Sequence, residues 1–298
     1  MTGQPDNSLI KAVTGLEGGC VACGSTCGIV SAGALCMALD HEAEIQMKGR
    51  AGEEEALVRA GDFVRWFEAA YGTSICREHT RADFYSTWGQ LKYFLTFYRM
   101  IGCFRRIRVP CGIFMMISPV KNRQRCRKRP RSRKMAPLHC AGYVLEGIRK
   151  NTGIGNRRLE GLSFVFDGGM GLSGGLCGAM AGAVIGINVL VGLPVREQSF
   201  WKTAAGFGIG HVNLLMDTPF GPKEPFRAGK QVIREFKKIA GTFACRNITG
   251  RLFSRPSEFQ EYVRVSETCK NLMDRMVEKA SQVVRRYQED ELRDMDNN

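Results

Sequence analysis

Apolar and polar residues recur along most of this chain with the period of an α-helix. The clearest stretch begins at Ser266, a suitable N-cap, and extends for five turns. Residues three and four positions apart share one face of a helix, so the stretch predicts a long helix with one buried side. The apolar residues of that side are Cys269, Leu272, Met273, Met276, Ala280, Val283, Val284 and Tyr287.

The same period predicts helices over residues 139–150, 157–166, 176–193, 197–216 and 227–240, with glycine or proline between them. A regular alternation of strands and helices is not visible. The segment 176–193 contains so many small residues that neighbouring helices can approach it closely. We therefore expect an all-α fold.

Two segments of the chain repeat in the same order. Residues 16–35 recur 150 positions later, with glycines and one cysteine, Cys27 against Cys177, in register. Residues 64–84 recur 169 positions later, and eight of these 21 positions are identical. Ordered matches of this kind indicate an internal duplication. We expect a duplicated helical-bundle module, with the second copy more complete than the first.

The net charge of +14 belongs almost entirely to one segment. Twelve lysines and arginines, and no acidic residue, lie between Arg105 and Lys134. Prolines interrupt this segment, so we expect it to resist helix and strand alike. We interpret residues 105–135 as a basic linker between a degenerate first copy, 1–104, and a complete module, 136–298. An alternative is a polybasic arm that binds nucleic acid or an anionic membrane, with Phe104 and residues 113–117 as its apolar partner.

The chain begins with a polar, mixed sequence that does not resemble a secretory signal, which favours the cytoplasm. Twelve cysteines in that compartment indicate thiols, metal ligands or redox pairs rather than a disulfide framework. Residues 18–39 and 168–195 carry no charge and are long enough to span a bilayer, so membrane association is an alternative. Their many glycines and serines favour close packing in a protein interior.

Four cysteines of the second copy are the candidate functional residues. Cys140, Cys177 and Cys269 lie on the apolar faces of predicted helices, and Cys245 follows a helix end. This placement is consistent with one interior site of redox thiols or metal ligands. Simple packing explains it equally well, because free cysteine is among the most buried residue types.

These residues resemble a family of proteins suspected of redox activity, the C-GCAxxG-C-C type. The match consists of Cys140, the CGAMAG run from Cys177 to Gly182, Cys245 and Cys269, and it covers about half of the chain. The resemblance implies a helical, thiol-bearing module with redox or metal chemistry, commonly associated with transport, and no agreed reaction. It therefore also implies an unidentified redox or transport partner.

The first copy departs from this pattern. Cys27 is followed by Gly-Ile-Val-Ser-Ala, so the CGAxxG motif is lost, and the counterpart of Cys140 would precede the first residue. Cys76 matches Cys245, and Cys103 is the candidate match for Cys269. Instead, Cys20, Cys23 and Cys27 form a C-x2-C-x3-C run. The run suits a soft metal or disulfide exchange as a weaker second site, or reflects incidental enrichment.

Two further features have alternative interpretations. Gly169, Gly171 and Gly174 form a GxGxxG pattern, which would bind a dinucleotide if residues 162–166 were the preceding strand. The absence of an acidic residue before Glu197 weakens that interpretation. His139 is either a ligand or activator of the neighbouring thiol, or a structural residue.

The sequence thus predicts a thiol–disulfide or metal-cluster electron-transfer protein, accessory to a transport system. One alternative is a non-catalytic protein that binds a soft metal, and another is a binding protein that acts through the basic linker. An iron–sulfur cluster, zinc, copper and no cofactor all remain open, as does a homo-oligomer. The sequence assigns no enzymatic reaction.

Overall fold

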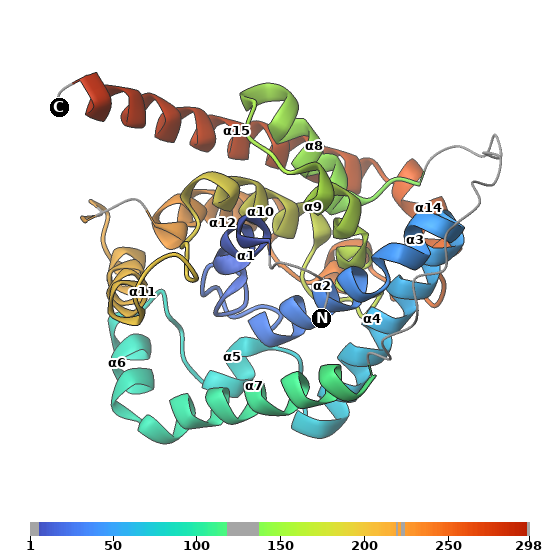
Figure 1. Ribbon diagram of the computed structural model, residues 1–298, viewed down its shortest axis with the longest axis horizontal. Coiled ribbons are helices and arrows are strands. Elements are labelled where there is room, and N and C mark those ends of the chain that lie inside the picture. Colours follow the sequence, from blue (N-terminus) through green and yellow to red (C-terminus); the bar gives the residue numbers. More distant parts are fainter. Residues whose placement is uncertain (1–5, 118–136, 219, 222–223, 297–298) are drawn as a thin grey trace.

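The computed structural model describes residues 6–218, except 118–136, together with 220–221 and 224–296. These residues form fifteen α-helices and two short 3-10 helices, and none of them forms a strand (Figure 1). The prediction of an all-α fold is confirmed. Within the described residues, no helix combines the length and the apolar character needed to cross a bilayer.

Module one comprises the helices before residue 118. Asp6 caps the first of them by accepting hydrogen bonds from the amides of Ser8 and Leu9. Gly72, with φ of 85°, ends the longest helix of this module, Arg50–Tyr71, in the left-handed conformation that glycine adopts most readily. The elements are α1 Asn7–Val13, η1 Thr14–Leu16, α2 Gly28–Asp40, α3 Glu42–Lys48, α4 Arg50–Tyr71, α5 Cys76–Thr80, α6 Thr87–Leu95 and α7 Phe97–Ile117.

Module two follows the same order and adds a helix in front. Gly241, with φ of 68°, ends its helix as Gly72 does 169 residues earlier. The hydroxyl of Ser266 accepts a hydrogen bond from the Cys269 amide, as expected of an N-cap. The elements are α8 Cys140–Thr152, α9 Arg157–Leu162, η2 Ser163–Phe166, α10 Gly178–Val191, α11 Phe200–Leu215, α12 Pro225–Ala240, α13 Cys245–Thr249, α14 Pro256–Val265 and α15 Glu267–Asp296.

The expectation that residues from Arg105 onward resist helix is wrong for the first part of that segment. Helix α7 continues to Ile117. Its apolar residues Phe97, Ile101 and Phe104 keep helical spacing, and one proline removes only one backbone hydrogen bond. Residues 118–135 of the basic segment, the greater part of its charge, lie outside the described residues, so their interpretation as a linker stays a prediction.

The duplication is visible in the backbone pairing of the two modules. In module one, Cys27 donates its amide hydrogen to the Ser74 carbonyl, and Cys76 donates to the Ser25 carbonyl, both at 2.8 Å. In module two, Cys177 donates to Phe243 at 2.8 Å, and Cys245 to Gly175 at 2.7 Å. The counterpart of α8 is absent from the described residues of module one. Module two is therefore the more complete copy.

The glycine-rich loops that precede α2 and α10 cross between the modules. A Cβ atom on Gly171 would lie 2.2 Å from the Gly61 amide nitrogen on α4, and one on Gly229 of α12 would lie 2.4 Å from the Val21 side chain. Between the loops, the buried Thr26 hydroxyl accepts a hydrogen bond from the Leu176 amide at 2.8 Å. The loop before α10 thus packs against α4, and the loop before α2 packs against α12.

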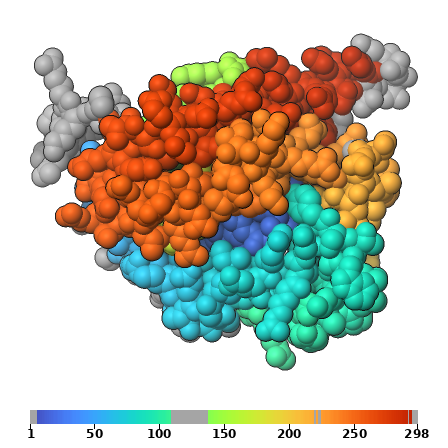
Figure 2. All heavy atoms as spheres, turned by 180° about the vertical axis from the view of Figure 1, so that it is seen from behind, coloured from blue at the N-terminus to red at the C-terminus, as the bar shows by residue number. Residues whose placement is uncertain are grey.

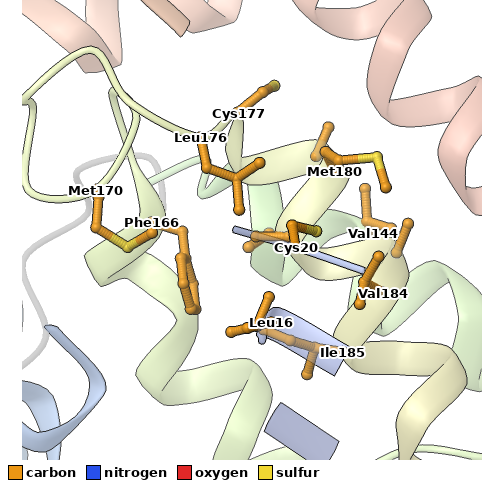
Figure 3. Close-up of a cluster of buried hydrophobic side chains, with 14 of the residues drawn as sticks. Leu16, Cys20, Val144, Phe166, Met170, Leu176, Cys177, Met180, Val184 and Ile185 are labelled. Atoms are coloured by element: carbon orange, nitrogen blue, oxygen red, sulfur yellow. The ribbon is translucent and has the colours of Figure 1, made fainter. Parts of the chain in front are cut away.

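Helix α10 is at the centre of the resulting core. Almost all of its residues are buried, and it packs against α1, α8, α12 and α15. Figure 3 shows side chains of both modules in this core, with Leu16 of module one close to Ile185 of module two. The two modules therefore share one hydrophobic core. Figure 2 shows α15 lying along the outside of the molecule, above the helices of module one.

Candidate thiol site

The four cysteines of module two line one small cavity of about 10 Å³. Cys140 is the first residue of α8, Cys177 is the N-cap of α10, Cys245 is the first residue of α13 and Cys269 lies in the first turn of α15. Each keeps only 6–9% of its surface exposed. The structure thus brings all four candidate residues together, at the N-terminal ends of the helices that carry them.

Backbone hydrogen bonds fix Cys177 relative to Cys245. The pair Leu176 and Ala244 forms an isolated antiparallel bridge, and the two amide bonds given above flank it. Because both cysteines immediately follow the bridged residues, their side chains leave the bridge on the same face. This short pairing holds two thiols in place without a sheet.

The two glycines of the CGAxxG motif bring α8 against α10. A Cβ atom on Gly178 would lie 3.0 Å from the Cβ of Cys140, and one on Gly182 would lie 2.7 Å from the carbonyl oxygen of Ala141. The distance at Gly182 is too short for a real side chain, and the distance at Gly178 is tighter than almost all real Cβ contacts. The motif therefore serves packing: it lets the first turn of α8, and with it Cys140, approach the N-terminus that carries Cys177.

A buried carboxylate anchors the same turn of α8. Asp167, which has no exposed surface, accepts a hydrogen bond from the Cys140 amide at 3.2 Å. Its second oxygen lies 2.7 Å from His139 Nδ1. On the other side of the ring, His139 Nε2 lies 3.6 Å from a carboxylate oxygen of Glu53, on α4 of module one. His139 is thus held between carboxylates of both modules.

These contacts determine the charge of His139. Burial alone lowers the pKa of His139, but the charge and hydrogen bond of Asp167, with a smaller effect of Glu53, raise it to about 10. Burial raises the pKa of Asp167, while His139 and the Cys140 amide lower it. With a 2.7 Å contact, we assign the pair as imidazolium and carboxylate at neutral pH.

Burial raises the pKa of every thiol in the cavity. It raises the pKa of Cys177 to about 11, although the amides of Ala179 and Met180 act in the opposite direction. Burial raises the pKa values of Cys140 and Cys245, and the charge of Asp167 and the neighbouring thiols raise both further. Burial raises the pKa of Cys269 as well. The resting site therefore holds neutral thiols.

We expect the alkylation rate of Cys177 to depend steeply on pH. The thiolate is the reactive form, and a thiol with a pKa of about 11 is ionised to about one part in a thousand at pH 8. The rate should rise about tenfold per pH unit between about pH 7 and pH 11. Peptide mass spectrometry after iodoacetamide treatment measures this, with exposed Cys36 as internal reference. A rate that levels off near pH 7 would contradict the assigned environment.

The positions of the possible metal ligands can be compared with the metal site that the sequence suggested. Within the described residues, no three cysteine, histidine, aspartate or glutamate side chains are grouped closely enough to hold a metal ion. This finding covers the four cysteines of module two and the run Cys20, Cys23 and Cys27. Thiolates suit soft metals by chemistry, but these thiols do not form a coordination group in this arrangement.

Module one brings together Cys27, Cys76 and Cys103, which match Cys177, Cys245 and Cys269. Burial raises the pKa values of Cys27 and Cys76, and the neighbouring Cys103 raises both further. The carboxyl of Glu17 also raises the pKa of Cys76. The Tyr93 hydroxyl lies 3.5 Å from Cys103 Sγ. This grouping reproduces the one around Cys177, without a counterpart of Cys140.

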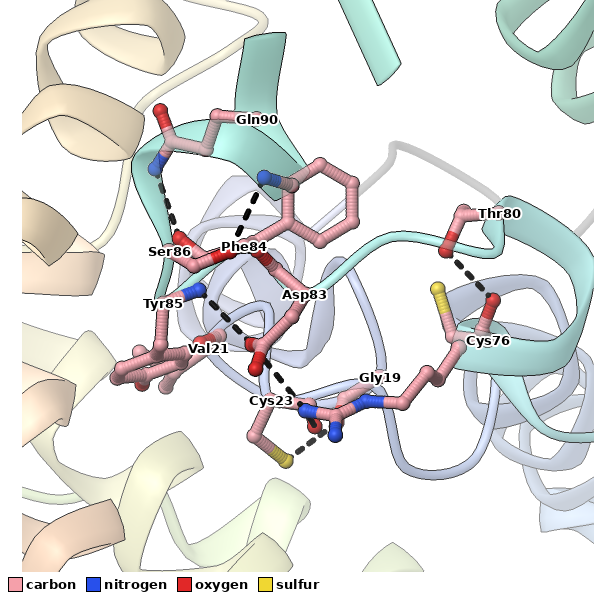
Figure 4. A network of polar contacts seen from close by, with 12 residues as sticks. Gly19, Val21, Cys23, Cys76, Thr80, Asp83, Phe84, Tyr85, Ser86 and Gln90 are labelled. Carbon is pink, nitrogen blue, oxygen red and sulfur yellow. Dashed lines mark hydrogen bonds and ion pairs between the residues drawn. The ribbon is translucent and has the colours of Figure 1, made fainter. Parts of the chain in front are cut away.

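Cys20 packs in the hydrophobic core, and Cys23 forms a hydrogen bond within its own loop. Figure 3 shows Cys20 inside the hydrophobic cluster, close to Leu176 and Val184, whereas Cys177 is directed away from it. The Cys23 thiol donates a hydrogen bond to the Gly19 carbonyl at 3.0 Å, within the polar network of the loop (Figure 4). The C-x2-C-x3-C spacing therefore reflects the path of this loop.

The glycines of the GxGxxG pattern also have packing roles. Residues Ser163–Phe166 form a 3-10 helix where a dinucleotide site requires a strand. Gly169, Gly171 and Gly174 all have positive φ, between 59° and 80°. Gly171 is the residue in close contact with α4. The loop is thus buried between the modules, and the dinucleotide interpretation is wrong.

Sequence reasoning missed Asp167 and Glu53. The only sequence signal for Asp167 was its alignment with Glu17, an acidic residue at the same position of an otherwise uncharged segment in both copies. Glu17 is the instructive counterpart. One of its carboxyl oxygens is buried with no hydrogen-bond partner, and burial raises its pKa to about 8. Glu53 could not be connected to His139 before the modules were placed together.

Comparison with known proteins gives one match. A family model described as "Putative redox-active protein (C_GCAxxG_C_C)" matches residues 1–104 and 138–283, which is most of the chain and includes both modules. Neither a curated protein nor a solved structure matches the chain.

Proposed function

Because the chain belongs to the C-GCAxxG-C-C family of redox-active proteins, we propose that it is a thiol–disulfide redox protein whose working pair includes Cys177. The observation that carries the proposal is the convergence of four cysteines from four helix N-termini on one cavity. Positive helix ends favour an anionic sulfur and offset part of the effect of burial, as the amides of Ala179 and Met180 do for Cys177. Packing alone does not require this convergence.

The chemistry that fits is exchange with the disulfide of a partner. The Cys177 thiolate attacks one partner sulfur, the partner's S–S bond breaks, and its second sulfur leaves as a thiolate. A second cysteine of the cavity then loses its proton and attacks Cys177, which releases the partner as a dithiol. The protein gains a disulfide and the partner gains two electrons and two protons. Cys245 is the favoured second cysteine because the backbone bridge holds it beside Cys177.

The other functions suggested by the sequence have less support. A metal or an iron–sulfur cluster would have to rearrange the thiols, since they form no three-donor group among the described residues. The transport role follows from the resemblance alone. Binding of an anionic partner through the basic segment rests on residues outside the described range.

The test is reversible oxidation of the unmodified protein and of variants in which one cysteine is replaced by serine. After mild oxidation of the full-length protein, we expect two thiols to disappear and to return with dithiothreitol, and mass spectrometry to locate the bond in the module-two cavity. Cys177→Ser should abolish this bond, whereas Cys36→Ser, on the exposed face of α2, should retain it. Iron, zinc and copper analysis of the same anaerobic sample is included. Stoichiometric metal that is lost in Cys177→Ser, or an unchanged thiol count after oxidation, would overturn the proposal.

A further inference from the structure

Helices α6 and α7 expose a continuous series of large apolar side chains, which we call the α6–α7 face. Its members are 43–72% exposed. On α7, Phe97, Ile101 and Phe104 follow one another at helical spacing, so they form a stripe rather than scattered residues. The face consists of Trp88, Leu91, Leu95, Phe97, Tyr98, Ile101, Phe104 and Ile107.

The duplication allows this face to be compared with module two. Through the match of Cys103 with Cys269, α7 corresponds to α15, which packs against α8 and α10 in module two. Ile107 corresponds to the buried Met273, and the described part of module one contains no counterpart of α8 to cover it. Ile101 and Phe104 correspond to Glu267 and Lys270, which are exposed in module two, so module one carries apolar residues where module two carries charged ones. Figure 2 shows this part of the chain, in teal, at the surface of the molecule.

The charges within the segment that forms the face have one sign. Lys92, Arg105 and Arg108 are exposed between its apolar residues. The sequence contains no aspartate or glutamate between Asp83 and Glu146. An apolar stripe interspersed with basic residues is complementary to a surface that is both apolar and anionic.

We infer that the α6–α7 face binds the surface of an anionic lipid bilayer. Its tryptophan, phenylalanine and tyrosine side chains enter the interface between headgroups and acyl chains, and its lysine and arginines contact the lipid phosphates. A nucleic acid would use the basic residues but would leave most of the apolar area unsatisfied. The helices lie on the membrane, since none in the described chain qualifies to cross it.

Vesicle sedimentation of the full-length protein tests this inference. We expect binding to phosphatidylcholine vesicles that contain about one third phosphatidylserine, weaker binding at high ionic strength, and little binding to pure phosphatidylcholine. The triple variant Trp88→Ser, Phe97→Ser, Phe104→Ser should lose about tenfold or more in partition coefficient. The charge variant Lys92→Gln, Arg105→Gln, Arg108→Gln should show a similar loss, and its fold should be unaffected because all three side chains are exposed.

The matched control is Val58→Ser with Val265→Ser, two apolar residues that are 44% and 77% exposed on other surfaces. It should bind vesicles as the unmodified protein does. Four results would overturn the inference: no binding to anionic vesicles, equal losses in the control, binding of an oligonucleotide instead of vesicles, or a dimer in sedimentation velocity that the triple variant abolishes. The last result would make the face an interface between two copies of the chain.

Discussion

Replacing Asp167 by alanine should lower the free energy of unfolding by about 3–5 kcal/mol. The carboxylate is fully buried, lies 2.7 Å from His139 Nδ1 and accepts the Cys140 amide at 3.2 Å. Its removal leaves a partly buried imidazolium without its closest partner and a buried amide without an acceptor. Urea denaturation followed by circular dichroism measures the loss.

The loss of stability caused by Asp167→Ala should become smaller as the pH rises. The folded-state pKa of His139, about 10, lies above its ordinary value of 6.5. The stabilisation from the pair is therefore fully present below about pH 6.5 and is lost as the pH rises through about 10. The difference in unfolding free energy between the unmodified protein and Asp167→Ala should shrink over that interval. A difference that grows with pH would show that the pair is not ionised as assigned.

Module one supplies the matched control for this prediction. Glu17 occupies the position equivalent to Asp167, but one of its carboxyl oxygens is buried without a partner. Glu17→Gln removes a group that burial already keeps from ionising at neutral pH, since its pKa is about 8. We expect a change of less than about 1 kcal/mol. A loss as large as that of Asp167→Ala would indicate a general need for a carboxyl at this position.

Replacing Gly182 by valine should cost about 1–3 kcal/mol and should disrupt the thiol site. The first added carbon would lie 2.7 Å from the carbonyl oxygen of Ala141 and 2.9 Å from its Cα, so α8 must move away from α10. Cys140 would move with it. Besides urea denaturation, the alkylation rate of Cys140 at fixed pH measures this movement and should rise.

Two substitutions serve as controls for Gly182. Ala32 occupies the equivalent position of α2, where no helix covers it, and Ala32→Val should leave stability nearly unchanged. Gly161 in α9 has no atom within 4 Å of an added Cβ, so Gly161→Ala should be neutral or slightly stabilising. If Ala32→Val lowered stability as much as Gly182→Val, contact with α8 would not be the reason that α10 needs glycine at position 182.

The helices were predictable because their apolar residues keep a regular period. The stripe from Cys269 to Tyr287 and the duplication depend only on local spacing, and both are reflected in the fold. The meeting of four cysteines was accessible because three of them lie on the apolar faces of predicted helices and because the family resemblance groups all four. Their chemical role remains a proposal.

What the sequence could not reveal depends on contacts between distant residues. The glycines of the loops read as a nucleotide motif, because nothing local shows that Gly171 faces Gly61 on another helix. The spacing of Cys20 and Cys23 suggested a ligand pair, although one thiol enters the shared core and the other bonds a loop carbonyl. Prolines and charge suggested an irregular segment after Arg105, but helix α7 continues through its first part.

The crossing of the two glycine-rich loops has a consequence for the origin of the protein. Each loop packs against a helix of the partner module, and the Leu176 amide donates to the hydroxyl of Thr26, the equivalent position of the other copy. A single unduplicated module would leave that surface open and would complete it with an identical neighbour, by a self-complementary contact. The chain therefore has the build of a homodimer joined into one polypeptide. Once joined, the two halves could diverge, and module two alone lines the four-cysteine cavity.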